Sequence, residues 1–78
     1  MKIIISQRDK KLLITFQQGD AVDSYYVDKA DGFLDVLDRF IKKRKMNLTL
    51  LKKSQLKFEN VGLLTERVIR AIMLGLGF

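Results

Sequence analysis

The sequence predicts a single α/β domain over residues 1–78, a two-layer sandwich in which two helices cover one face of a four-stranded mixed sheet. Three observations lead to this prediction. Apolar and polar residues alternate in the first third of the chain, as they do in half-buried strands. Apolar residues then recur at helical spacing, and a further alternating segment precedes an apolar C-terminal stretch. A chain of 78 residues has room for one small core only.

Three strands are predicted before the first helix. Met1–Ser6 is rich in isoleucine, and Lys11–Gln17 alternates between apolar and polar side chains. Ala21–Val27 contains two tyrosines and two valines, which are strong strand formers. The turns at Gln7–Lys10 and Gln18–Asp20 are too short for a crossover connection, so the three strands should form an antiparallel meander.

The first helix is predicted from the change of period after Val27. Apolar residues recur from Phe33 to Ile41, with acidic side chains early and basic side chains late, the order that the helix dipole favours. Asp31 is expected to be the N-cap, and Asn47, followed by apolar Leu48, is expected to be a left-handed C-terminal cap.

A fourth strand and a second helix complete the predicted domain. Ser54–Asn60 alternates, Gly62 ends the strand, and the last helix covers residues 63–78. A right-handed strand–helix–strand crossover would pair the fourth strand in parallel with the first, which gives the sheet order 3-2-1-4. Because the strands alternate, both helices are expected on one face of the sheet. That face carries Leu12, Ile14 and Phe16.

The composition argues against an enzyme. The chain has no cysteine and no histidine, which removes disulfides, the usual zinc sites and histidine-activated nucleophiles. The aspartates are not clustered on the first strand, and no glycine-rich phosphate loop is present. We therefore expect no catalytic residue, no metal site and no cofactor.

The same composition predicts a cytoplasmic protein that has no membrane contact. The absence of cysteine fits a reducing compartment. The apolar C-terminal segment carries three charges and is shorter than the roughly 20 apolar residues that a spanning helix needs.

The order β-β-β-α-β-α resembles the start of the RNase H-like, actin-like fold, and the C-terminal stretch resembles the bacterial TsaB family. TsaB proteins carry Gly-Pro-Gly-Ser-Phe-Thr-Gly-Leu-Arg, followed by Ile-Gly-Leu-Ala-x-Ala-x-Gly-Leu-Ala-Phe or similar. Here ENVGLLTERVIRAIMLGLGF, residues 59–78, runs in parallel without a gap. The matching positions are Arg67, Ala71, Gly75, Leu76 and Phe78. The glycine-rich loop is replaced by residues 59–65, and the family's fifth strand and second half are not seen in this sequence.

The resemblance implies a minimal or truncated N-terminal half of a TsaB-like protein. TsaB is a non-catalytic subunit in the synthesis of threonylcarbamoyladenosine in tRNA. The family pairs through this region with another copy or with a related TsaD-like catalytic subunit. For this chain the resemblance therefore implies a protein-interaction role, a homodimer or heterodimer, and a tRNA contact.

The last helix supports a partner chain on independent grounds. Its apolar surface is about twice as wide as the stripe that a helix needs to lie on one sheet. The excess predicts a two-fold homodimer, unless the first helix and the strand ends bury both flanks. We expect the chain's own core to be faced by Val68, Ile72 and Gly75. The predicted partner-facing residues are Ile69, Met73 and Leu76, with Leu74 and Phe78 as the second choice.

A basic run supports an alternative function as a small RNA-binding module. The chain carries a net charge of +6, and the segment from Arg39 to Lys57 contains no acidic residue. Such a run can bind nucleic-acid phosphates, although it is also typical of a solvated helix end. The candidate contacts are Lys42, Lys43, Arg44, Lys45, Lys52 and Lys53.

Overall fold

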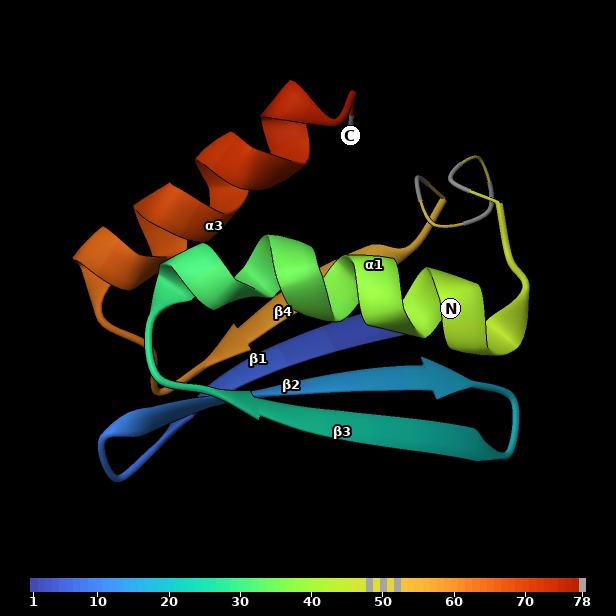
Figure 1. Ribbon diagram of the computed structural model, residues 1–78. Helices are drawn as coiled ribbons and strands as arrows, with labels where there is room; N and C mark the ends of the chain where they lie inside the picture. Colours follow the sequence, from blue (N-terminus) through green and yellow to red (C-terminus); the bar gives the residue numbers. More distant parts are fainter. Residues whose placement is uncertain (48, 50, 52, 78) are drawn as a thin grey trace.

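The computed structural model describes residues 1–47, 49, 51 and 53–77, which form a two-layer α/β domain (Figure 1). The elements, labelled as in Figure 1, are β1 (Lys2–Arg8), β2 (Lys11–Gln18), β3 (Ala21–Val27), the short 3-10 helix η1 (Ala30–Gly32), α1 (Phe33–Arg44), β4 (Gln55–Glu59) and α3 (Leu63–Gly75).

The sheet confirms the predicted topology. Its strand order is β3-β2-β1-β4, with β1–β2 and β2–β3 antiparallel and β4 parallel to β1. Ile5 on the central strand β1 lies opposite Ile14 on one side and Phe58 on the other. This register aligns the apolar side chains of neighbouring strands on one face, and Figure 1 shows both helices on that side of the sheet.

The two hairpin turns are tighter than predicted. β1 continues to Arg8, so the first loop contains only Asp9 and Lys10. Asp9 has a φ of 55° and Gly19, the first loop residue of the second hairpin, has a φ of 61°. A positive φ at this position belongs to the primed turns, whose twist matches that of the flanking strands.

The core lies between the inner sheet face and the two helices. Phe40 of α1 stacks on Phe16 of β2 with ring centroids 4.0 Å apart, and Tyr25 meets Phe16 edge-on at 5.9 Å. The buried side chains of α1 are spaced at three and four residues, as the predicted helical period requires. They are Phe33, Val36, Leu37 and Phe40.

The N-cap prediction at Asp31 is wrong. Asp31 lies inside η1, and the N-cap of α1 is Gly32, which makes no side-chain capping bond. A Cβ atom at Gly32 would lie 3.0 Å from the Cβ and the Cγ1 of Val27. The close approach of the β3 end to this turn, and not a capping side chain, therefore selects the residue at the helix start.

The C-cap prediction at Asn47 is also wrong. The left-handed residue is Lys45, with a φ of 53°, and the next residue, Met46, donates its N–H to the carbonyl of Ile41 at 3.1 Å. This is the Schellman arrangement, in which an apolar residue follows the left-handed one and packs back onto the helix. Met46 makes that contact against the core. Leu48, the apolar residue predicted for this role, lies outside the described residues.

Candidate interaction surface

One stripe of α3 packs on the domain's own core. Ile69 is fully buried and Met73 is 6% exposed, while Ile72 and Leu76 are half-buried against the same core. These four residues are three or four positions apart and therefore share one helix face. The prediction that Ile69, Met73 and Leu76 face a partner is wrong for the first two, because the domain's own core covers both side chains.

The predicted core-facing set of α3 is also partly wrong. Ile72 packs on the core as expected, and Val68 is half-buried. Gly75 is exposed, and a Cβ atom built on it meets nothing within 4 Å. Gly75 therefore lies on the outer side of the helix.

The outer side of α3 carries a second apolar stripe. Leu63, Leu64 and Leu74 are 64%, 76% and 72% exposed, and Ala71 and Gly75 are exposed beside them. We define these five residues as the outer α3 face. Leu74 was the second choice from sequence, whereas Leu63, Leu64 and Ala71 were missed. Ala71 follows Leu64 by seven residues, and Leu74 follows Ala71 by three. This spacing puts the three side chains on one helix face and was the sequence signal for the stripe. Phe78 lies outside the described residues.

Two ionic groups on α3 flank the outer face, and a third, Arg67, lies within it between the leucines. Glu66 pairs with Arg70 one turn later at 3.5 Å. The guanidinium carbon of Arg70 also lies 4.9 Å from the centre of the Phe58 ring on β4, so this side chain is held toward the sheet. Arg67 is exposed and lies at the spacing of the outer stripe.

A shallow apolar groove lies between α1 and the end of α3. Its volume is about 360 Å³, and it is lined by Leu34, Leu37 and Ile41 of α1 together with Leu76 and two aspartates. Leu34 is 48% exposed, so α1 also presents apolar surface there. Of the predicted interface residues, Leu76 therefore contributes to this groove and not to the outer α3 face.

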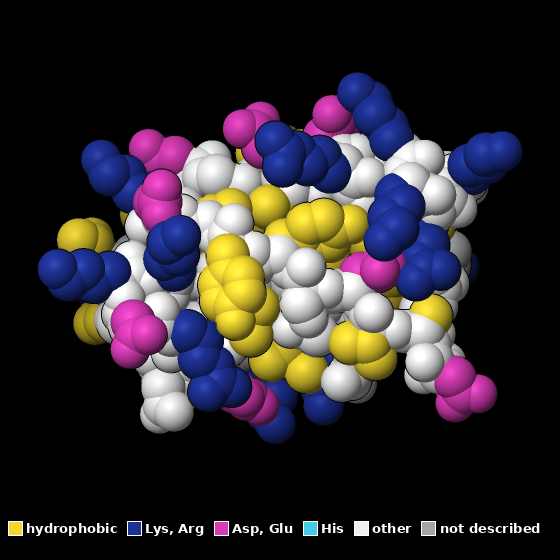
Figure 2. Space-filling view, turned by 60° about the horizontal axis from the view of Figure 1, so that its bottom comes forward, with side chains coloured by type: hydrophobic (Ala, Val, Ile, Leu, Met, Phe, Trp, Pro, Cys, Tyr) yellow, Lys and Arg dark blue, Asp and Glu magenta, His cyan; other side chains and the backbone are white. Residues whose placement is uncertain are grey.

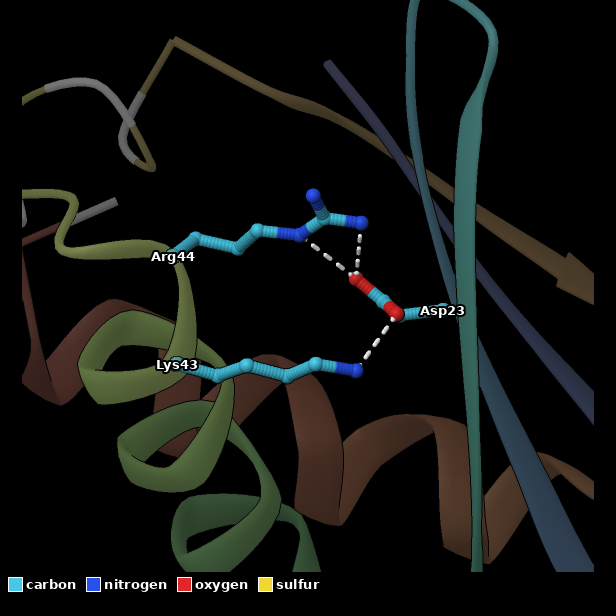
Figure 3. A network of polar contacts seen from close by, with 3 residues as sticks. All are labelled: Asp23, Lys43 and Arg44. Carbon is cyan, nitrogen blue, oxygen red and sulfur yellow. Dashed lines mark hydrogen bonds and ion pairs between the residues drawn. The ribbon is translucent and has the colours of Figure 1, made fainter.

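Three of the six predicted RNA contacts form ion pairs with aspartates of the domain. Asp23 of β3 accepts a hydrogen bond from Lys43 Nζ at 3.0 Å and one from Arg44 Nε at 2.8 Å, and Arg44 Nη2 lies 2.6 Å from the same carboxylate (Figure 3). Lys42 pairs with Asp38 at 3.0 Å. The hydrogen bonds from Lys43 and then Arg44 hold the pKa of the Asp23 carboxyl below its ordinary value.

The remaining predicted RNA contacts lie near the end of α1. Lys45 and Lys53 line one cavity of about 390 Å³, together with Met46, Asn47 and Thr49. Lys52 lies outside the described residues. The structure therefore brings Lys45 and Lys53 together and directs Lys43 and Arg44 to Asp23.

Neither a metal-binding cluster nor a membrane-spanning helix is found among the residues that the structure describes. Among residues 1–47, 49, 51 and 53–77, no three or more acidic side chains are grouped so that they could hold a metal ion. In the same part of the chain, no helix has both the length and the apolar character needed to cross a membrane.

Comparison with protein-family models, with curated proteins and with solved structures finds no match to this chain.

Proposed function

We propose that this chain is a non-catalytic association module that pairs with a second copy of itself through the outer α3 face. The observation that supports the proposal is the exposure of Leu63, Leu64 and Leu74, each between 64% and 76%, on one helix of 13 residues. Burying a leucine side chain is worth about 1.5–3 kcal/mol, so a contact that covers these leucines on both copies has a substantial driving force.

The small residues on this face favour a second helix as the occupant. Ala71 and Gly75 lie one turn apart, with open space where the Gly75 side chain would be. Such a pair lets another helix backbone approach closely, although the best-known examples come from membrane helices. When the approaching helix is α3 of a second copy, a two-fold axis repeats each leucine contact. Small domains also commonly gain stability through oligomerisation.

The family resemblance suggests the biological process in which such an association would take part. The strand order matches the expectation from the RNase H-like fold, and Ala71 and Gly75, two of the positions shared with TsaB, lie on the outer α3 face. We therefore propose that the chain takes part in tRNA threonylcarbamoyladenosine synthesis in the cytoplasm, a role that the resemblance implies. A TsaD-like catalytic subunit is then the heterologous partner to test if the chain does not pair with itself.

Sedimentation equilibrium across the micromolar range tests the self-association. The wild-type protein should approach twice the chain mass, and Leu74→Glu should sediment as a monomer, because two carboxylates would enter an apolar contact. Val22→Glu is the matched control: Val22 is 56% exposed, but it lies on β3 in the other layer. This variant should still dimerise.

A wild-type protein that is monomeric throughout this range would rule out the homodimer. The proposal would also fail if Leu74→Glu and Val22→Glu dimerised equally well, or if both became monomers. Either result would remove the assignment to the outer α3 face.

A further inference from the structure

The sheet face opposite the helices is open and has a basic character. The register places four cations on it, Lys2, Arg8, Lys11 and Lys57, and one strand carboxylate, Glu59. Its apolar side chains are Ile4, Leu13, Val22 and Tyr26. Figure 2, which turns the lower side of Figure 1 forward, shows apolar side chains near the middle, with Lys and Arg side chains and some Asp and Glu side chains around them.

A concave site lies at the β1–β2 turn on this face. It has a volume of about 570 Å³ and is lined by Arg8, Asp9, Lys10, Lys11 and Tyr26. Tyr26 is 62% exposed, so much of its ring is open to a ligand. The turn backbone is held by the Gln7 side-chain amide, which donates to the carbonyls of Asp9 and Lys11 at 3.1 and 3.3 Å.

The charges around the ring favour an anion. Three cations and one carboxylate line the site, and the further acid Asp28 lies 3.9 Å from Lys11 in a contact between two well-exposed side chains. An exposed ion pair of this kind is worth little, so Lys11 can exchange Asp28 for a phosphate at small cost.

We propose that this site binds single-stranded nucleic acid, with one base stacked on Tyr26 and neighbouring phosphates on Arg8, Lys10 and Lys11. An aromatic ring beside a basic groove is the arrangement by which proteins bind single strands without reading their sequence. A duplex keeps its bases stacked inside and cannot offer one to the ring. The site shares no residue with the contacts predicted in the basic run. The β1–β2 turn and Asp23, which holds Lys43 and Arg44, lie toward opposite ends of the sheet.

Fluorescence anisotropy with labelled oligonucleotides of about ten nucleotides tests this site, since single-strand site sizes span roughly 4–16 nucleotides. RNA and DNA single strands and the corresponding duplex are compared. Tyr26→Ser should weaken single-strand binding about fivefold or more, and Tyr26→Phe should keep most of the affinity because it keeps the ring. Arg8→Gln with Lys10→Gln should reduce the slope of log affinity against log salt by about 0.7 for each phosphate contact removed.

The charge control is Arg67→Gln, which removes an exposed cation from α3 in the other layer of the domain and should leave the slope unchanged. Tighter binding of RNA or of DNA identifies the source of the strand, and either result supports the site. Three results would overturn it: no binding of single strands at low salt, equal binding of duplex, or unchanged affinity in Tyr26→Ser. A thermal melt of each variant verifies that the exposed substitutions leave the fold intact.

Discussion

At the residue scale, Asp23 links the two layers of the domain. Its carboxylate lies on the helix-covered side of edge strand β3, is 11% exposed, and receives Lys43 and Arg44 from the last turn of α1. The Lys43 and Arg44 side chains would otherwise be solvated at the C-terminal end of α1. Through Asp23 they hold this end of the helix against β3.

Replacing Asp23 should make stability depend less on pH. The Lys43 and Arg44 hydrogen bonds place the folded pKa of Asp23 below its ordinary value of 3.8. Stability from this carboxylate is fully present above the unfolded pKa and is lost as the pH falls through the folded pKa. Asp23→Asn should therefore lower Tm at neutral pH, and the difference from wild type should shrink below pH 3.8, as measured by circular dichroism.

Asp38→Asn provides the matched control. It removes the Asp38–Lys42 pair, whose side chains are 62% and 76% exposed, and exposed pairs contribute little. An equal loss of Tm in the two variants at neutral pH would contradict a special role for Asp23. The sequence predicted the basic run but not this contact, because a partner 20 residues away on a strand leaves no local pattern.

At the element scale, the sequence predicted the four strands, α1 and α3, but not the short helix η1, because strands and longer helices have clearly different apolar periods. The isoleucines of β1, the alternation in β2, the tyrosines and valines of β3 and the three- and four-residue spacing in α1 left little ambiguity. The helix ends were predicted poorly, because Gly32 and Met46 occupy their positions through contacts with Val27 and the core.

The orientation of α3 was the larger error, and its cause is also physical. Apolar residues surround most of this helix, so periodicity alone does not select between the stripe of Ile69 and Met73 and the stripe of Leu64 and Leu74. Packing on the shared core determines the orientation of α3, and only the stripe of Ile69 and Met73 is buried.

Truncation of the two stripes should therefore have unequal effects on folding. Ile69→Ala should lower the free energy of unfolding by about 2–5 kcal/mol, because it opens a cavity in the core. Leu64→Ala, at a side chain 76% exposed, should change it by less than about 0.5 kcal/mol. Urea denaturation in the Leu74→Glu background separates folding from association. Similar effects of the two truncations would contradict the observed orientation of α3.

At the scale of the whole molecule, one sheet face and two helices share a single small core, and the other sheet face is open. Chains of this size bury only roughly 60% of their unfolded surface, so their stability is marginal. The exposed leucines of α3 add apolar surface that the monomer leaves in water. Cover by a second copy would therefore stabilise the fold as well as assemble the protein.

This coupling predicts a melting temperature that depends on protein concentration. Association that requires the folded chain stabilises it by mass action, so the wild-type Tm should rise as the concentration increases across the micromolar range. Leu74→Glu should melt at one temperature over the same range, and the two proteins should converge on dilution, because Leu74 lies outside the core of the single chain. Scanning calorimetry at several concentrations measures both. A wild-type Tm that stays constant with concentration would show that the isolated domain carries all of its stability, and the homodimer proposal would fall with it.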